Sequence, residues 1–361
     1  MTKSDPAPPT PRISVIVCTR NGRDRIPACL RSLTKLTRAA DEILVVDDGS
    51  TDGTADSITR HFPQVTVLPL PPCGLSAARN AGAHAATGEI LAYTDDDCEV
   101  DPDWLTSLAQ GFSAGWDAVG GPNLPPPPAH AIESMIAAAP GAASHVMLDD
   151  QEAEHIPGCN LAVRRTAFFE IGGFDPDFRT AGDDVDFCWR LQDAGKRIGF
   201  APTAFVWHHR RATLWGYLKQ QTHYGKAEAL LMKKHPSRFT PSGDARWQGI
   251  IYTGSPVRVT GAATIYHGAM GLAGYQKAHF RMQPLRDLPP EDNHLPIRWL
   301  LKFTSALASR LRTHARTGQF RAPLRERRGG GGGGGAGGGA GGGGGGARGA
   351  GAGRGGAAGR G

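Results

Sequence analysis

Residues 42–53 read EILVVDDGSTDG, and this stretch decides the fold class that the sequence predicts. Glu42 to Val46 is a short, mainly apolar run rich in β-branched side chains, which indicates a buried β-strand. The acids, serine and glycines from Asp47 onward are typical of turns, and Asp and Ser also suit the N-cap of a helix over Ala55 to His61. The stretch therefore predicts a strand, a polar loop and a helix in succession.

The same succession recurs on both sides of this stretch. Further strands are predicted at Ile13 to Cys18, Val65 to Leu68 and Glu89 to Tyr93. Further helices are predicted at Ile26 to Leu36, at Leu75 to Ala86 and from an N-cap at Asp101. Because parallel strands need crossover connections, this alternation predicts a three-layer α/β/α domain with a mostly parallel central sheet.

Three polar clusters each follow one of the predicted strands: Thr19 to Asn21, Asp47 to Asp52, and Asp95 to Asp97. Sheets of this kind bind ligands at the carboxyl ends of their strands. We therefore expect the three clusters to meet at one edge of the sheet.

The aspartates admit more than one interpretation. Three consecutive carboxylates, Asp95 to Asp97, repel one another unless a cation neutralises them, and a hard ion such as Mg²⁺ or Mn²⁺ meets that demand. A solvated acidic turn that caps the next helix is the alternative. Asp48 either belongs to a turn or contacts a ribose or base amide. Asp183 and Asp184 form either a helix N-cap or a carboxylate base for a hydroxyl group.

The cationic residues are equally ambiguous when taken one by one. Arg79 lies in a helix of small residues, where it either faces solvent or reaches a diphosphate as a fork-shaped donor. His208 and His209 follow the apolar run Ala204 to Trp207, and each is either a surface or core histidine or a ligand.

Charge, cysteine content and hydropathy exclude several other classes. Residues 298–328 carry nine Lys and Arg against one acid, whereas residues 1–297 have a net charge of −5, so the pI of 9.1 does not indicate a nucleic-acid binder. The six cysteines form no Cys-x-x-Cys pair and have no matching histidine cluster, so neither a disulfide framework nor a zinc site is expected. Without a long apolar run, we expect a cytoplasmic protein that can lie peripherally on the inner face of the cell membrane.

Five segments in this order resemble the motifs of the family-two glycosyltransferases: SVIVCTRN (14–21), VVDDGSTD (45–52), ARNAG (78–82), DDD (95–97) and GDDVD (182–186). The resemblance covers about Arg12 to His235 and implies the A-type glycosyltransferase fold. It further implies a metal-dependent inverting enzyme that moves a sugar from a nucleotide-diphosphate sugar to a hydroxyl group. The acceptor would be a saccharide or a lipid-linked molecule, in cell-surface polysaccharide or glycolipid synthesis.

The resemblance also implies roles for single residues. The nucleotide sugar would be held by polar residues of the first four motifs: Thr19, Arg20, Asp48, Arg79, Asp95 and Asp96. The metal, Mg²⁺ or Mn²⁺, would be bound by Asp97, with His208 as a further contact and His209 as its adjacent alternative. Asp184 would be the catalytic base.

This chain departs from the family at one position, because Asp183 stands where many members have glutamate. The shorter side chain withdraws that carboxylate by one methylene. The Gln-x-x-Arg-Trp motif of the processive members is not found, so transfer of one residue per encounter is expected.

The sequence predicts four parts: a disordered N-terminus (1–11), a catalytic domain (12–240), a C-terminal extension (241–328) and a disordered Gly/Ala/Arg tail (329–361). Residues 297–311 have helical apolar spacing beside basic residues, which suits either an anionic membrane surface or packing on the domain. Two other functions remain open: metal-dependent phosphoryl or nucleotidyl transfer, and a catalytically silent binder of sugar nucleotides or RNA.

Overall fold

The computed structural model describes residues 11–126, 136, 144–209, 211, 213–241, 243–253 and 266–267. The chain divides into two units, Met1–Phe320 and Arg321–Gly361, and every described residue belongs to the first. The basic helix expected within 297–328, the tail from 329 and nearly all of the N-terminal segment 1–11 lie outside the described residues.

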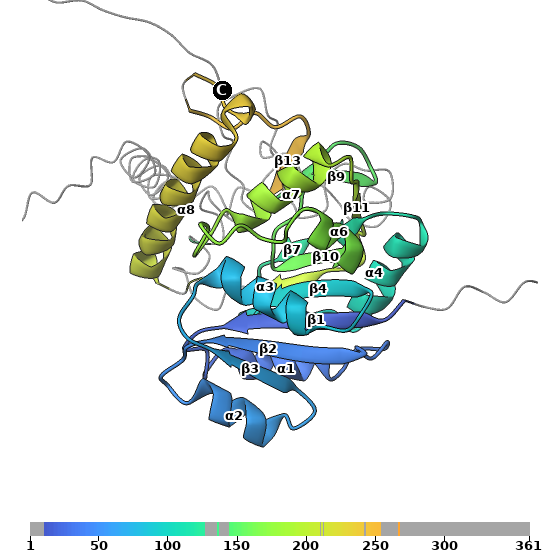
Figure 1. The fold of residues 1–361 in the computed structure, drawn as a ribbon, viewed down its shortest axis with the longest axis vertical. Helices are drawn as coiled ribbons and strands as arrows, with labels where there is room; N and C mark the ends of the chain where they lie inside the picture. The colour runs from blue at the N-terminus through green and yellow to red at the C-terminus, as the bar shows by residue number, and fades with distance from the viewer. Residues whose placement is uncertain are drawn as a thin grey trace, which may run out of the picture. The chain divides into compact units, whose positions relative to one another are not determined.

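The first four strands of the central sheet are parallel, as the alternation of strands and helices predicts (Figure 1). In the order β3-β2-β1-β4 they are Thr66–Leu70, Glu42–Asp48, Ile13–Thr19 and Ile90–Asp95. β1 pairs with β2 on one side and β4 on the other, in a register that places Thr19 beside Asp47 and Cys18 beside Asp95. The carboxyl ends of these strands therefore lie at one edge.

Beyond β4 the sheet becomes mixed. β10 (Asn160–Arg164) runs antiparallel to β4 and to β6 (Ala118–Gly120). The remaining strands follow in the order β11 (Ile198–Phe200), β9 (Glu152–His155), β8 (His145–Met147), β13 (Ile250–Thr253) and β14 (Tyr266–His267). Because β13 pairs with β8, the sheet continues past residue 240, where we expected the catalytic domain to end.

A second sheet consists of three short strands in the order β5 (Cys98–Val100), β12 (Val206–His208) and β7 (Asn123–Leu124). β12 runs antiparallel to β5, and His208 lies opposite Cys98 in their ladder. This sheet brings a histidine from late in the chain next to the segment that contains the three aspartates.

Helices cover both faces of the central sheet, and the buried apolar side chains form two main clusters accordingly. The first cluster includes side chains of α1 (Ile26–Leu33), α2 (Thr54–His61) and α4 (Trp104–Ser113). The second includes side chains of α3 (Leu75–Ala85), α6 (Arg165–Glu170) and α7 (Asp183–Asp193). The expected three-layer α/β/α class is confirmed.

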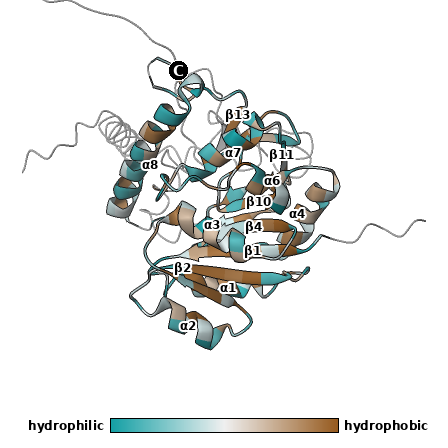
Figure 2. Ribbon diagram, in the orientation of Figure 1, coloured by the Kyte–Doolittle hydropathy of each residue, from teal (hydrophilic) through white to brown (hydrophobic). Residues whose placement is uncertain are grey.

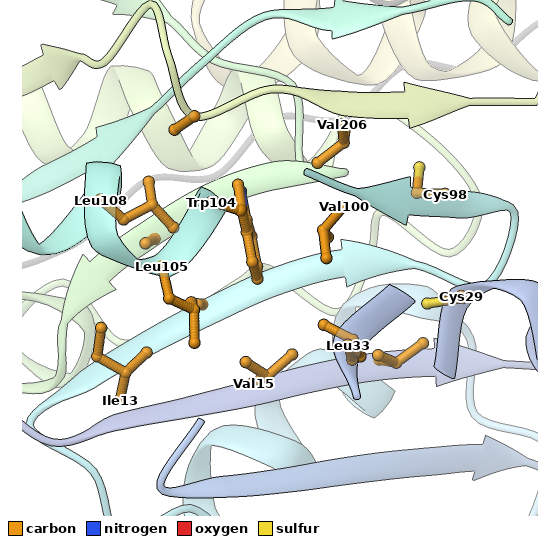
Figure 3. Close-up of a cluster of buried hydrophobic side chains, with 14 of the residues drawn as sticks. Ile13, Val15, Cys29, Leu33, Cys98, Val100, Trp104, Leu105, Leu108 and Val206 are labelled. Atoms are coloured by element: carbon orange, nitrogen blue, oxygen red, sulfur yellow. The ribbon is translucent and has the colours of Figure 1, made fainter. Parts of the chain in front are cut away.

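The strand β1 shows how the sequence produces this division. Val15 and Val17 belong to the first cluster and Ile16 to the second, because successive side chains of a strand point to opposite faces. Figure 2 shows mainly apolar residues along the inner strands, and Figure 3 shows Trp104 of α4 near Val15 and Leu33. The inner strands are apolar on both sides until the polar residues at their ends.

The long helix α8 (Leu214–Lys234) begins after Thr213, whose side chain accepts a hydrogen bond from the Gly216 N–H. Its Leu231 packs in a small cluster with Phe178 and Trp189, and a short 3-10 helix, η1 (Pro236–Arg238), follows it. Among the helices of the described residues, none is both long and apolar enough to cross a membrane.

Two of the predicted acidic caps accept N–H groups at helix starts: Asp101 Oδ1 accepts that of Asp103 just before α4, and Asp52 Oδ1 accepts that of Thr54 in α2. α4 begins at Trp104 and not directly after Asp101, while α2 and α7 follow Gly53 and Gly182, which have φ angles of 81° and 80°. The residues before these helices make no side-chain capping hydrogen bond. Asp184 Oδ1 accepts the Val185 N–H at 2.9 Å in the first turn of α7, whereas Asp183 pairs with Arg79.

Candidate active site

The loops after β1 and β2 are tied together at the carboxyl edge of the sheet. The Asn21 N–H donates to Ser50 Oγ at 2.8 Å, and the Thr51 N–H donates to Asn21 Oδ1 at 2.8 Å. Asn21 has a φ of 49°, a conformation that asparagine tolerates better than most residues. Two of the predicted polar clusters are therefore in direct contact.

The β1 loop also contacts the third cluster. Thr19 Oγ1 donates to Asp96 Oδ2 at 2.7 Å, and Arg25 donates to the same oxygen at 2.9 Å. A side chain at Gly22 would place its Cβ 2.2 Å from Thr19 Oγ1, so only glycine permits this approach. Burial raises the pKa of Asp96, and the hydrogen bonds from Arg25 and Thr19 oppose that rise only in part.

Arg79 is buried and lies between two carboxylates, so the solvent-facing interpretation is wrong. Its guanidinium pairs with Asp95 at 2.8 Å and with Asp183, and only 4% of its side chain is exposed. The guanidinium also lies over the ring of Phe174. Arg79 therefore holds β4 and α7 together through their acids.

Asp183 is almost fully buried beside Arg79, with 3% of its side chain exposed. Burial raises its pKa to about 6, and the neighbouring acids Asp184 and Asp95 act in the same direction, while Arg79 lowers it. One guanidinium cannot neutralise all three carboxylates. The shortening from glutamate to aspartate at this position thus coincides with a structural ion pair.

Asp184 has looser partners than Asp183. Its Oδ2 accepts the Gly158 N–H at 3.0 Å and lies 3.7 Å from Nε2 of His155, and 23% of its side chain is exposed. A Cβ at Gly158 would lie 2.5 Å from Arg79, so the glycine lets this loop approach both groups. Burial would raise the pKa of Asp184, but His155, the Gly158 N–H and Arg79 outweigh it and lower the pKa.

His155 is a part of this site that sequence reasoning missed. Its Nδ1 lies 2.9 Å from the carbonyl oxygen of Ser144, which can only accept, so Nδ1 carries a proton. Nε2 faces Asp184 at 3.7 Å, and among the residues that the structure describes it has no hydrogen-bond partner. The apolar and acidic pattern of β9 gave no sign of this contact, because it depends on how β9 lies against α7.

Asp97 faces two cationic side chains that come from beyond residue 200. His208 Nε2 lies 3.4 Å from Asp97 Oδ1, and Arg211 lies 3.4 Å from Oδ2. Burial would raise the pKa of Asp97, but His208 and Arg211 outweigh it and lower the pKa. His209 pairs instead with Glu99 at 2.8 Å, so of the two histidines the structure places His208 at the acid.

The remaining predicted residues differ in burial and in the hydrogen bonds that they make. Asp48 accepts backbone N–H groups of Cys73 and Gly74, at the start of α3, and is buried. Its neighbour Asp47 makes the turn contact, to the Ser50 N–H at 2.8 Å. Arg20 follows β1 and is exposed.

Asp97 and His208 form a donor set that fits a divalent ion. A carboxylate oxygen and an imidazole nitrogen 3.4 Å apart suit Mn²⁺ or Mg²⁺, which accept oxygen ligands and, for Mn²⁺, imidazole. Asp95 and Asp96 form close ion pairs with Arg79 and Arg25. Asp97 is therefore the acid of this segment with the longest distances to its cationic partners.

Comparison with known proteins bears on the family of this chain. The model of "Glycosyl transferase family 2" matches residues 14–172. Glycosyltransferase AglE of Haloferax volcanii is 31% identical over 229 residues, which cover 60% of this chain and 73% of that protein. The chain belongs to glycosyl transferase family 2. The family expected from the five motifs is thereby confirmed.

Two further comparisons define the extent of the likeness. The pre-mycofactocin glycosyltransferase of Mycobacterium tuberculosis is 30% identical over 249 residues, so this family 2 chain aligns over 65% of its own length and spans about half (51%) of that relative. Mannosyltransferase PcManGT from Pyrobaculum calidifontis, solved with GDP-Man and Mn²⁺, has a TM-score of 0.54 at 19% identity, covering 88% of this chain and 91% of that one. The second likeness supports the A-type fold.

The fold brings together two cysteines and a histidine that form no spacing motif in the sequence. Cys98, Cys159 and His208 place their sulfur and nitrogen atoms within 4.8 Å of one another. The three residues are 110 positions apart from first to last, so no local spacing motif could reveal them. All six cysteines are free thiols.

Proposed function

We propose that this chain transfers a sugar from a nucleotide-diphosphate sugar to a hydroxyl group, in a single displacement that inverts the anomeric carbon. One observation carries the proposal: Asp97 and His208, far apart in sequence, face each other across 3.4 Å at the strand edge of a family 2 fold. An acid and an imidazole so placed can hold Mn²⁺ or Mg²⁺ next to a diphosphate. When bound, such an ion stabilises the negative charge that develops on the leaving nucleoside diphosphate.

Asp184 is the proposed base. Its partly exposed carboxylate can take the proton of the acceptor hydroxyl as the oxygen attacks the sugar. The Gly158 N–H at 3.0 Å fixes one oxygen, and His155 at 3.7 Å keeps the carboxylate ionised before the acceptor arrives. His155 is a positioning residue in this scheme, since it acts through Asp184.

The donor is proposed to lie over the loops after β1, β2 and β4. Thr19 and Asp48 are buried at the ends of their strands, and exposed Arg20 lies beside them, near the nucleoside. Asp95 and Asp96 face the ribose and phosphates in this proposal, while Arg79 fixes Asp95 and contributes positive charge near the diphosphate.

The acceptor class is inferred to be a saccharide or a lipid-linked hydroxyl, in cell-surface polysaccharide or glycolipid synthesis. The basic segment 297–328 would bring the enzyme to an anionic membrane surface from the cytoplasmic side. Liposome co-sedimentation of the full chain tests this. Equal binding to neutral and anionic vesicles would contradict the membrane role while leaving the transferase proposal intact.

Thermal shift with nucleoside diphosphates, with and without Mn²⁺, tests the metal site. We expect a metal-dependent rise in melting temperature that Asp97→Asn abolishes. Glu99→Gln, an exposed acid two residues away, should retain the rise. A full metal-dependent rise in Asp97→Asn would contradict the assignment.

A panel of sugar nucleotides, followed by mass spectrometry, tests the reaction itself. Sugar transfer or slow release of free sugar is expected. Transfer of a phosphoryl or nucleotidyl group would instead identify the alternative enzyme class, and nucleotide binding without turnover of any donor would favour a silent binder.

A further inference from the structure

A cluster of soft metal ligands lies directly beside the proposed hard-ion site. Cys98 at the start of β5, Cys159 before β10 and His208 at the end of β12 bring two sulfurs and an imidazole nitrogen within 4.8 Å of one another. Cys98 and Cys159 are buried, with 1% and 3% of their surfaces exposed. Because Cys98 and His208 are opposite residues of one β-ladder, the backbone fixes their separation.

The two ring nitrogens of His208 face different partners. Nδ1 lies 4.0 Å from Cys159 Sγ, whereas Nε2 lies 3.4 Å from Asp97 Oδ1. Histidines that ligate a metal usually donate their other ring N–H to a carboxylate, which fixes the tautomer and the ring orientation. His208 has this arrangement: Nδ1 faces the sulfur atoms, where a metal could bind, and Nε2 faces the carboxylate of Asp97.

Supporting contacts also orient the sulfur atoms. Asn123 Nδ2 donates to Cys159 Sγ at 3.6 Å, and Asp97 Oδ1 lies 4.0 Å from Cys98 Sγ. Asn123 is buried on β7, the strand that pairs with β12 on its other side. All three strands of the small sheet therefore contribute a residue to the cluster or to its support.

We infer that Cys98, Cys159 and His208 bind one soft divalent cation of the zinc or cadmium class, through two thiolate sulfurs and the imidazole Nδ1. Sulfur and imidazole are the ligands that such ions prefer in proteins. The two thiols release their protons to solvent on binding, and the resulting thiolates balance both charges of the ion, so the buried site is neutral.

The geometry needs only a small adjustment. Zinc bonds of about 2.3 Å to sulfur and about 2.0 Å to nitrogen place tetrahedral ligands roughly 3.5 Å apart. The observed distance of 4.0 Å between Cys159 Sγ and His208 Nδ1 exceeds that value by about half an ångström. A fourth position remains for water.

The shared imidazole makes the two metal sites antagonistic, a consequence that rests on the proposed function, whereas soft-metal binding does not. With Nδ1 bound, the ring proton lies on Nε2 and is donated to Asp97. Neither His208 Nε2 nor the Asp97 oxygen that accepts its proton is then free to bind Mn²⁺ or Mg²⁺. Zinc should therefore lower the affinity for Mn²⁺.

Metal titration of the full reduced chain, without donor or acceptor, tests the site. Cd²⁺ should produce the ultraviolet thiolate charge-transfer band with saturation at one ion per chain. Cys98→Ala and Cys159→Ala should each weaken binding at least tenfold. Cys29→Ala, which removes a similarly buried thiol from α1, should leave binding unchanged. Equal Cd²⁺ affinity in all four proteins would overturn the proposal.

A second measurement avoids dependence on the folding of the variants. X-ray absorption of the wild-type chain loaded with one Zn²⁺ should show two sulfur neighbours and at least one nitrogen neighbour. A shell of only oxygen and nitrogen, or failure to retain zinc on gel filtration, would contradict the assignment. Neither outcome bears on sugar transfer, so the two proposals fail separately.

Discussion

The surroundings of Arg79 and those of His208 lie in the same site but differ in how completely their charges are paired. Arg79 is closely bound by Asp95 and Asp183 and is nearly fully buried. Asp97, by contrast, has its two cationic partners at 3.4 Å. Asp184 resembles Asp97, since its nearest basic side chain, His155, is 3.7 Å away. Acids from the same two motifs therefore divide into those that hold the elements together and those still available to a ligand.

The largest effect is expected where an available acid is removed. Asp184→Asn should lower the rate of transfer by about 10²–10⁴-fold, because the amide cannot accept the hydroxyl proton. Nucleotide affinity should be unchanged in isothermal titration. Asp193→Asn, at the exposed end of the same helix, serves as the control. Transfer at the wild-type rate by Asp184→Asn would refute the base assignment.

Removing Arg79, whose charge is fully paired, should instead lower the stability of the fold. Arg79→Met leaves two carboxylates without their partner and should lower the free energy of unfolding by about 3–5 kcal/mol. Arg25→Met removes an arginine whose side chain is 42% exposed and should cost less than about 1 kcal/mol. Urea unfolding measures both. Similar losses would show that the buried pairs of Arg79 stabilise the fold no more than the half-exposed pair of Arg25.

The pH dependence of stability gives a finer test of the surroundings of Arg79, through the pKa of Asp183. Folding raises the pKa of Asp183 from 3.8 to about 6, so the folded state binds more protons than the unfolded state between these values. The wild-type chain should therefore lose up to about 2–3 kcal/mol of stability relative to Asp183→Asn as the pH rises from about 4 to 6. Urea unfolding at several pH values should reveal this. Parallel curves would show that Asp183 ionises as easily when folded as when unfolded.

The smallest effect concerns the link between His155 and the base. Since His155 lowers the pKa of Asp184, His155→Phe should move the acidic limb of the kcat/KM profile to higher pH. Phenylalanine preserves the ring that packs near Trp247. His145→Phe alters another buried histidine, on the neighbouring strand, and should leave the limb in place. A limb that stays unmoved in both variants would show that His155 only fills space.

Much of the fold followed from short patterns. Each early strand is a run of apolar residues that ends at a polar cluster, and the parallel register brings those ends together. The expected edge was thus predictable, and Thr19, Asp96 and Asn21 contact its other groups as expected. The strands of the mixed half of the sheet were harder to predict from the sequence, because they are only two to five residues long and several pair antiparallel.

The sequence by itself determined the order of strands and helices, the edge at which the polar loops gather, and the identity of the acids there, because these depend on local periodicity and on where an apolar run stops. Only the tertiary structure decided which charge meets which. Arg79 pairs with an acid 104 positions away, and His208 at the end of β12 faces Asp97, whereas His209 directly after the strand faces Glu99. Coulomb and ligand contacts act over a few ångströms of space, and the chain brings distant residues within that range only after it has folded.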